Sequence, residues 1–215
     1  MDRFTKQLIY MRGYLQGCKY HAASEALDMA QNIHVGVRKD GITPEFAHQI
    51  AMACYAITIL PLLTYPEETL SAIFLHDAIE DYNITRDEIK SRFGEIVHDA
   101  VFYLTKLYIC ESDNKIRNKI KPEHYFRGVG HNEIASIVKG IDRMHNQQTM
   151  VGVFSHEGQI HYIEESETYI LPMLKVARKK FPYQTMAYLN VKTVLESQIE
   201  MLRVINGMPV PNYDD

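Results

Sequence analysis

Helical spacing of apolar residues is the feature that most constrains the fold of this chain. Ala26, Met29, Ala30 and Ile33 recur at intervals of three and four residues, which places them on one face of an α-helix. A second stripe of this kind runs through residues 89–104. The strict alternation of a half-buried strand is nearly absent. The pattern therefore predicts an all-α fold.

Helix-start signals agree with this pattern, since Thr64 with Glu67 and Thr85 with Glu88 have the spacing of capping boxes. The stripes are too irregular for a coiled coil and no repeat has a fixed period, so a globular array of many helices is expected rather than a solenoid. A short β-hairpin is expected near residues 151–162. The expected helices cover about residues 3–17, 21–34, 45–62, 65–80, 85–92, 95–107, 131–149, 162–180 and 184–205.

The composition is typical of a water-soluble globular protein, with 46% hydrophobic and 23% charged residues. No linker-like stretch divides the chain, so we expect one domain over residues 1–215, with the helices of 162–205 packing on the rest. The net charge of -4 provides no global basic field for nucleic acid or membrane, so an anionic ligand needs local charges or a metal. The sequence has no signal-peptide pattern and no long apolar run. With only Cys18, Cys54 and Cys110, a reducing, cytoplasmic setting is favoured.

Two segments do not fit a helical pattern, residues 36–44 and 108–130. The second lies in a stretch with six basic residues between Lys106 and Arg127 against three acidic ones. Long loops in compact domains often carry function. This basic loop is therefore either a solvated mobile loop or a lid that attracts phosphate.

The strongest chemical signal is the sequence His76-Asp77-Ala78-Ile79-Glu80-Asp81. On one continuous helix, His76 would share a face with Glu80, and Asp77 would share a face with Asp81. These polar groups interrupt an otherwise apolar helix, so their burial needs a strong partner. A divalent cation would supply that partner.

Further candidate groups stand apart in the sequence. Asp142 and Asn146 lie one helical turn apart after an apolar run, and His48 lies early on another apolar helix. Each of them alone is more typical of an exposed helix end or a satisfied histidine than of a site. A second His-Asp pair, His98-Asp99, has no carboxylates one turn later, and we interpret it as a surface or satisfied pair.

Together these motifs resemble a known family. The ordered set of His48, His76-Asp77 and Asp142 is similar to the ligand set of the HD-domain metal-dependent phosphohydrolases. Further motifs narrow the resemblance to the hydrolase domain of the RelA/SpoT homologues, over about residues 21–175, and at 215 residues the chain resembles a small alarmone hydrolase of that type. These motifs are His34-Val-Gly-Val-Arg38-Lys39-Asp40-Gly41 with Pro44, His76-Asp77-x-x-Glu80-Asp81, Phe93-Gly94 before Leu104-Thr105-Lys106, and Asp142-Arg143-x-His145-Asn146.

The resemblance implies an enzyme that removes the 3′-pyrophosphate from guanosine tetra- or pentaphosphate, usually with Mn²⁺, and returns GDP or GTP. Its metal ligands would be His48, His76, Asp77 and Asp142. This mixed imidazole and carboxylate set suits Mn²⁺ or another divalent cation better than a thiolate-bound zinc. Glu80 and Asp81 would position and activate the attacking water. Substrate binding would fall to Arg38, Lys39, Lys106, Arg143 and Asn146.

Some assignments stay open in the sequence. Lys106 and Arg143 contact phosphate or form surface salt bridges, and His34 is either a further ligand or an ordinary helix-end histidine. Glu45, Gln49 and Tyr82 stand where the family usually has Tyr, Pro and Thr. Since these positions surround the nucleotide, the base stays open between guanine and adenine.

Other functional classes are also compatible with the motifs. One alternative is another HD phosphohydrolase, such as a nucleotidase or an NADPH 2′-phosphatase. The second is a non-catalytic nucleotide-binding or antitoxin-like protein. The functional counterpart of an alarmone hydrolase could be a toxic alarmone synthetase. No partner nucleic acid or membrane is expected, and the oligomeric state is open.

Overall fold

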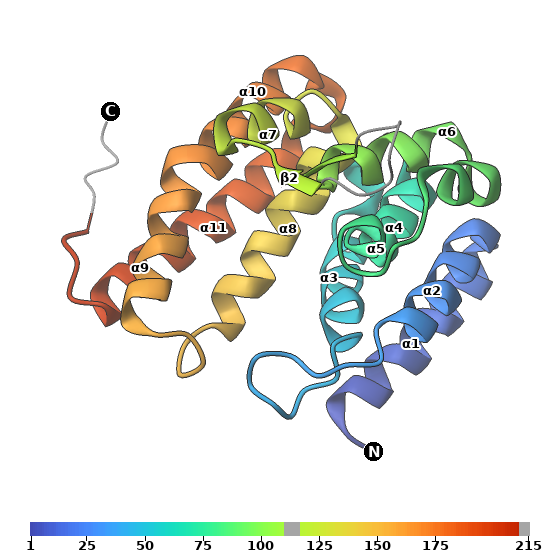
Figure 1. The fold of residues 1–215 in the computed structure, drawn as a ribbon, viewed down its shortest axis with the longest axis horizontal. Helices are drawn as coiled ribbons and strands as arrows, with labels where there is room; N and C mark the ends of the chain where they lie inside the picture. Colours follow the sequence, from blue (N-terminus) through green and yellow to red (C-terminus); the bar gives the residue numbers. More distant parts are fainter. Residues whose placement is uncertain (110–116, 211–215) are drawn as a thin grey trace.

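The computed structural model describes residues 1–109 and 117–210, which form an array of packed helices (Figure 1). The α-helices are α1 Arg3–Cys18, α2 His21–Ile33, α3 Ala47–Ile57, α4 Pro66–Leu75, α5 Ala78–Asp81, α6 Arg86–Leu104, α7 Pro122–Val129, α8 Glu133–Thr149, α9 His156–Glu165, α10 Leu171–Lys180 and α11 Thr185–Ile205. The short turns are η1 Leu60–Leu62, the π-helical η2 Ser166–Ile170, and η3 Pro182–Gln184. Two short strands, β1 Leu107–Ile109 and β2 Arg117–Lys119, pair antiparallel. The predicted all-α fold is confirmed.

Two central helices carry the polar groups of interest. In α4, every residue from Thr69 to Leu75 is buried, and the helix packs against α2, α3, α6 and α8. In α8, every residue from Ile134 to Met144 is buried, against α3, α4 and α11 among others. The approach of α8 to α11 requires Gly140, because a Cβ there would lie 2.6 Å from Val191 Cγ1. Polar side chains on such buried helices need specific partners.

One of the two predicted capping boxes is correct. The Thr85 side chain accepts a hydrogen bond from the Glu88 N–H and begins α6. The box at Thr64 is wrong, because α4 begins at Pro66 and Glu67 has a different partner. The Glu67 carboxylate accepts the N–H of Ala22 at 2.8 Å, at the start of α2. This carboxylate therefore ties α4 to α2.

The continuous helix predicted for residues 65–80 is wrong near its end. α4 stops at Leu75, and the short α5 begins only at Ala78. His76 and Asp77 occupy the junction, where Asp77 has φ -100° and ψ -2°. The polar groups of this segment therefore do not share the faces of one straight helix. By contrast, the break expected at Gly94 is present, since this glycine has φ 83° and ψ 175° within α6.

Two expectations for irregular segments are also wrong. The hairpin expected at 151–162 is instead the start of α9, because Ser155 accepts the Gly158 N–H and caps that helix. The loop expected over 108–130 contains α7, whose buried side chains hold it against the core. Residues 110–116, with Lys115 and the centre of the expected basic lid, lie outside the described residues.

The main hydrophobic core of the described residues is continuous, as expected for a single domain. One cluster of buried hydrophobic side chains extends from Met11 in α1 to Leu195 in α11. This is what the predicted single domain requires, and the domain limits themselves stay a prediction. In the described part of the chain, Cys18 and Cys54 are free thiols, and Cys110 lies outside it. None of the helices in 1–109 and 117–210 has the length and apolar character to cross a bilayer.

Candidate active site

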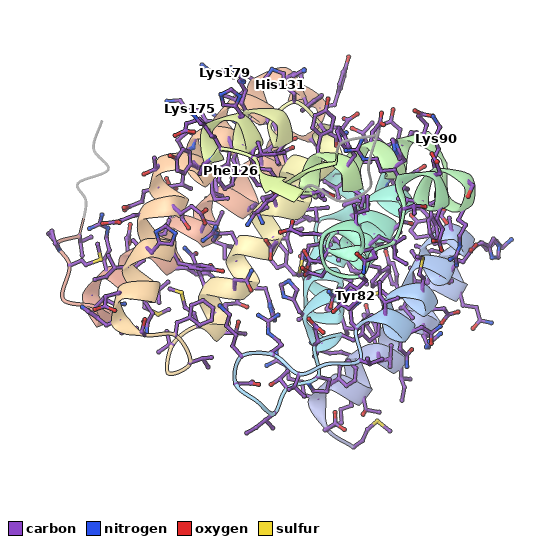
Figure 2. The ribbon with its side chains drawn as sticks, viewed as in Figure 1. Tyr82, Lys90, Phe126, His131, Lys175 and Lys179 are labelled. Atoms are coloured by element: carbon purple, nitrogen blue, oxygen red, sulfur yellow. The ribbon has the colours of Figure 1, made fainter. Side chains whose placement is uncertain are left out.

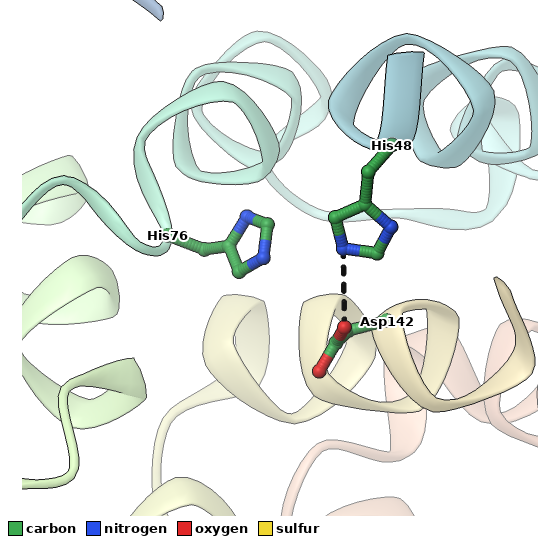
Figure 3. Close-up of side chains that lie close together, drawn as sticks. All are labelled: His48, His76 and Asp142. Atoms are coloured by element: carbon green, nitrogen blue, oxygen red, sulfur yellow. Dashed lines mark ion pairs between the residues drawn. The ribbon is translucent and has the colours of Figure 1, made fainter. Parts of the chain in front are cut away.

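Three side chains from distant parts of the sequence meet at the centre of the molecule (Figure 3). His48 comes from the first turn of α3, His76 from the end of α4, and Asp142 from the middle of α8. All three are buried, and one potential ligand atom of each lies within 4.8 Å of the others. His48 Nε2 is 3.2 Å from Asp142 Oδ1. The polar side chains of the two central helices thus converge on one point.

Both imidazole rings are oriented by hydrogen bonds on their outer nitrogens. His76 Nδ1 lies 2.8 Å from the Ile73 carbonyl oxygen, and His48 Nδ1 lies 2.7 Å from His145 Nδ1. Burial, and then the neighbouring His48, lowers the pKa of His145 to about 3, so His145 is a neutral ring. Its Nδ1 would accept the Nδ1 proton of His48 when a cation occupies His48 Nε2. Both inner Nε2 atoms then face the carboxylates. This is the arrangement that metal-binding histidines use, so the residues fit a divalent cation.

Asp77 pairs with one of these rings. Its Oδ2 lies 2.9 Å from His76 Nε2, and 36% of its side chain is exposed. Burial opposes a charge on His76, but Asp77 outweighs it and raises the pKa of His76 to about 9. Burial likewise opposes the Asp77 charge, but His76 lowers the pKa of Asp77 to about 2. The two groups form an ion pair beside the three-residue cluster.

Asp142 is surrounded by donors. Lys139 Nζ donates to its Oδ2 and Asn146 Nδ2 donates to its Oδ1, both at 2.6 Å. Burial opposes the carboxylate charge, but Lys139 and His48 hold the pKa of Asp142 well below its usual range. The Asp142 carboxylate is therefore anionic. Sequence reasoning missed Lys139, although its spacing of three residues from Asp142 on one helix was the available signal.

The carboxylates of α5 lie at the mouth of the same cavity. Glu80 Oε2 accepts a hydrogen bond from the Lys106 N–H at 3.0 Å. Burial, and then the charges of Asp77 and Glu80, raises the pKa of Asp81 to about 6. A carboxyl group with a pKa this close to neutrality is suited to accepting and releasing a proton.

One cavity of about 300 Å³ joins all the predicted site residues. These are His48, His76, Asp77, Asp142, Glu80, Asp81, Arg38, Lys39, Lys106, Arg143 and Asn146. Leu104, Lys139 and Tyr162 also line it and were not predicted. The cavity is rich in cationic groups, and the close Lys139 charge, with burial, lowers the pKa of Lys106. Such a site favours a ligand with several negative charges.

The cationic side chains differ in their availability. Arg38 Nη2 donates to Asn146 Oδ1 at 2.9 Å. Arg143 forms a buried ion pair with Glu165, and its guanidinium carbon lies 4.4 Å from the ring centroid of Tyr162. Glu165 therefore neutralises Arg143 within the fold. Of the two alternatives for Arg143, a phosphate contact or a surface salt bridge, the structure shows a salt bridge, and that salt bridge is buried.

Two other histidines lie outside the cluster. His34 Nδ1 is 2.8 Å from the carbonyl oxygen of Ala30 in its own helix, and its ring packs 4.5 Å from that of Tyr82. This is the arrangement of a helix-end histidine. His98 Nδ1 lies 2.9 Å from Asp99 Oδ1, whose side chain is 49% exposed. The second His-Asp motif is thus a satisfied pair at the surface of α6.

Comparison with known proteins agrees with this geometry. Residues 26–125 match the profile of the HD domain family. The match includes His48 and His76-Asp77, which supply both imidazoles of the cluster. Residues 26–125 are therefore similar to an HD domain. Asp142, on α8, lies beyond the matched range and completes the cluster from the C-terminal half.

The curated relatives of this protein are much longer chains. A probable guanosine-3′,5′-bis(diphosphate) 3′-pyrophosphohydrolase of Synechocystis is 28% identical over 149 residues, covering 69% of this chain and 19% of the relative. A GTP pyrophosphokinase rsh of Brucella ovis is 28% identical over 153 residues, covering 70% and 20%. A guanosine-3′,5′-bis(diphosphate) 3′-pyrophosphohydrolase of Vibrio cholerae is 31% identical over 94 residues, covering 44% and 13%. The chain thus spans about a fifth or less of the length of these relatives.

A solved structure matches this chain over most of the length of both proteins. It belongs to a metazoan orthologue of SpoT that is described as hydrolysing ppGpp. The superposition has a TM-score of 0.61 at 17% identity and covers 88% of this chain and 97% of the other. At this identity the likeness establishes the fold, including the C-terminal helices that follow the HD domain match.

Proposed function

We propose that this protein is a divalent-metal-dependent hydrolase that removes the 3′-pyrophosphate from guanosine tetra- or pentaphosphate, or from the adenine analogues. The observation that carries the proposal is the convergence of His48, His76 and Asp142 in a cavity that also holds two carboxylates and several cations. Relatives named as 3′-pyrophosphohydrolases and the fold of a ppGpp-hydrolysing protein support this substrate class.

The metal site of the proposal consists of His48, His76, Asp77 and Asp142. Nitrogen and oxygen donors of this kind suit Mn²⁺, Fe²⁺, Co²⁺ or Zn²⁺, and we propose Mn²⁺. When bound, the cation lowers the pKa of a coordinated water and polarises a phosphoryl oxygen. The hydrogen bonds on the outer nitrogens of both rings fix their inner nitrogens toward it.

We assign the handling of water to the carboxylates of α5. The main-chain N–H of Lys106 holds the Glu80 carboxylate in place at 3.0 Å, so Glu80 orients the attacking water. Asp81, with its pKa raised to about 6 by burial and by Asp77, accepts the proton. The water oxygen forms a bond to the phosphorus attached to the 3′-oxygen, and the P–O3′ bond breaks with its electron pair going to the 3′-oxygen. That oxygen takes up a proton, and pyrophosphate is released.

Phosphate recognition is assigned to the cations that line the cavity. Lys106 and Lys39 supply charges to the pyrophosphate. Arg38 and Asn146, which bond to each other, supply a planar guanidinium and an amide for the nucleoside. Arg143 acts through the fold, because Glu165 neutralises it and it supports the Tyr162 ring.

The test of the proposal is product analysis with chelator-treated protein. The substrates are guanosine tetraphosphate and its adenine analogue, each with and without Mn²⁺. Manganese-dependent release of pyrophosphate and GDP, or ADP, supports the proposal. Orthophosphate alone would favour another HD phosphohydrolase, and tight binding without turnover would favour a non-catalytic binder.

The chain offers a matched pair of control variants for this test. Asp77→Asn and Asp99→Asn each change the aspartate of a His-Asp motif whose His–Asp distance is 2.9 Å. Only Asp77 lies in the cavity. Asp77→Asn should abolish manganese-dependent turnover, whereas Asp99→Asn should keep it. A toxic alarmone synthetase as counterpart, the oligomeric state and a cytoplasmic location stay predictions.

A further inference from the structure

A second cavity lies against α6, α7 and α10, and the proposed reaction does not use it. Its volume is about 810 Å³, within the range of small-molecule sites. The described residues that line it include cationic and imidazole side chains but no carboxylate. The cationic and imidazole side chains are Arg86, His124, Arg127, His131 and Lys180.

The cationic groups of this cavity come from separate elements of the fold. Arg127 is in the last turn of α7 and His131 follows that helix, whereas Lys180 ends α10. His131 Nδ1 donates to the Arg127 carbonyl oxygen at 2.6 Å, which leaves its Nε2 as the outer ring atom. Lys180 Nζ donates to the His131 carbonyl oxygen at 3.4 Å. These contacts join the ends of α7 and α10, where Figure 2 places His131.

Aromatic rings form another part of the cavity wall. The guanidinium carbon of Arg86 lies 3.9 Å from the ring centroid of Phe102. Tyr103 is 37% exposed and packs beside Gly128 of α7, where a Cβ would lie 3.4 Å from Tyr103 Cδ1. Flat rings beside cationic groups suit a ligand that carries both an aromatic base and phosphates.

The second cavity shares a wall with the active-site cavity. Leu104 and Lys106 line the active site, whereas Thr105, between them, lines the second cavity. Tyr125, which also lines the second cavity, donates from its hydroxyl to the Leu104 carbonyl oxygen at 2.9 Å. The Lys106 N–H in turn holds Glu80. A ligand in the second cavity therefore contacts the segment that positions a carboxylate of the active site.

We propose that the second cavity binds a small oligophosphate anion, free or carried on a nucleoside, as an effector of the active site. Among the described residues that line it, several cationic and imidazole groups and no carboxylate favour a ligand with several negative charges. The cavity's volume of about 810 Å³ fits a small ligand, whereas single-stranded nucleic acid uses an extended basic groove. A ligand bound in the second cavity would act on the position of Glu80 through residues 104–106, which separate the two cavities.

The test measures binding in chelator by hydrogen exchange and calorimetry, with tripolyphosphate and GTP as separate probes. Neither probe carries a 3′-phosphate, so both report on the protein without turnover. The expected result is slower exchange in residues 120–131, in addition to any change in the active-site segments 38–48 and 139–146. Tighter binding of GTP than of tripolyphosphate would assign the nucleoside form, and the reverse order would assign the free form.

Variants separate this site from the active site. Arg127→Glu with Lys180→Glu should weaken binding at the second cavity about tenfold or more and remove the protection of residues 120–131. Arg178→Glu with Lys179→Glu is the matched control, because these neighbours on α10 are not among the residues that line the cavity. The first double variant should keep basal hydrolysis but lose the response of the rate to the probe.

Several outcomes would overturn the proposal. Protection confined to the active-site segments would place both probes there alone. Equal weakening by both double variants would indicate a non-specific charge effect. Binding of a single-stranded RNA with no binding of either probe would make this face a nucleic-acid surface, and a rate that ignores a bound probe would exclude the effector role. None of these readouts depends on which substrate the active site cleaves.

Discussion

Lys139 Nζ lies 2.6 Å from Asp142 Oδ2, one turn away on α8, and each side chain is only 9% exposed. The other oxygen of this carboxylate, Oδ1, lies 3.2 Å from His48 Nε2. The ammonium and the imidazole therefore fix the carboxylate from two sides. A buried charge pair of this kind stabilises a fold little by itself, because both groups lose their hydration. Its value here is the orientation of a carboxylate that the proposed metal needs.

Replacing Lys139 by Met should therefore separate orientation from folding. In chelator, Lys139→Met leaves the buried Asp142 charge without its ammonium, which should lower the free energy of unfolding by about 3 kcal/mol. Mn²⁺ should restore part of this loss, because the cation replaces the missing positive charge. Urea unfolding with and without Mn²⁺ measures both effects.

The matched control for Lys139→Met is Lys192→Met, which breaks the Lys192–Glu196 pair in α11. Those side chains are 38% and 24% exposed, so the loss should stay below about 1 kcal/mol and should not respond to Mn²⁺. Equal losses in the two variants would show that the buried pair has no special role.

The His76–Asp77 pair makes the stability of the metal-free protein depend on pH. Asp77 raises the pKa of His76 against the effect of burial, from 6.5 to about 9. A raised folded-state pKa gives stability that is fully present below the unfolded value, 6.5, and is lost as the pH rises through 9. This loss should be of the order of 2 to 3 kcal/mol. Thermal unfolding in chelator between pH 6 and pH 10 measures it.

The same scan has an internal control. In Asp77→Asn the carboxylate is gone, so most of the decline between pH 6.5 and pH 9 should disappear. With saturating Mn²⁺ the decline should also disappear, because a ligand imidazole is already neutral. A decline of the same size in the Asp77→Asn variant would assign it to other groups.

The Glu80→Gln variant tests the division of labour between metal binding and water activation. The new amide oxygen still accepts the Lys106 N–H, which lies 3.0 Å from Glu80 Oε2, so the fold should be preserved. The neutral amide orients the attacking water less well than the carboxylate does, so kcat should fall about 10²-fold or more while the Mn²⁺ affinity stays near the wild-type value. Glu88→Gln, on α6, is the control and should leave both unchanged. Parallel losses of metal and rate would contradict the assignment.

The sequence predicted which residues line the site more accurately than it predicted where the helices that carry them begin and end. Periodicity predicted apolar helices at α4 and α8 whose polar groups need partners, and the resemblance to the HD-domain hydrolases implied that these groups share one site. Periodicity did not reveal the break after Leu75, because His76 and Asp77 continue the helical spacing of α4 in the sequence. At the break, His76 Nδ1 contacts the Ile73 carbonyl oxygen and His76 Nε2 contacts Asp77, which are local contacts that the spacing does not reveal.

The other errors have local causes. Glu157-Gly158 resembles a turn, but the Ser155 cap and the packing of α9 make it the first turn of a helix. α7 was missed, although Pro122 at its start and the buried Tyr125 and Val129 gave the usual helical signals. The many charged residues around this segment led to the prediction of a loop instead of a short amphipathic helix.

The last prediction concerns His145, which contacts His48 through the atom opposite the proposed metal. The two Nδ1 atoms are 2.7 Å apart, and burial lowers the pKa of His145 to about 3, so the neutral His145 ring would accept the His48 Nδ1 proton when a cation occupies His48 Nε2. His145→Leu removes this acceptor and should raise the dissociation constant for Mn²⁺ about 10- to 100-fold. His145→Asn keeps an oxygen near the Nδ1 position and should recover much of the affinity. Calorimetric titration with Mn²⁺ measures this order, and equal affinity of the Leu variant and the wild type would leave His145 as a packing residue only.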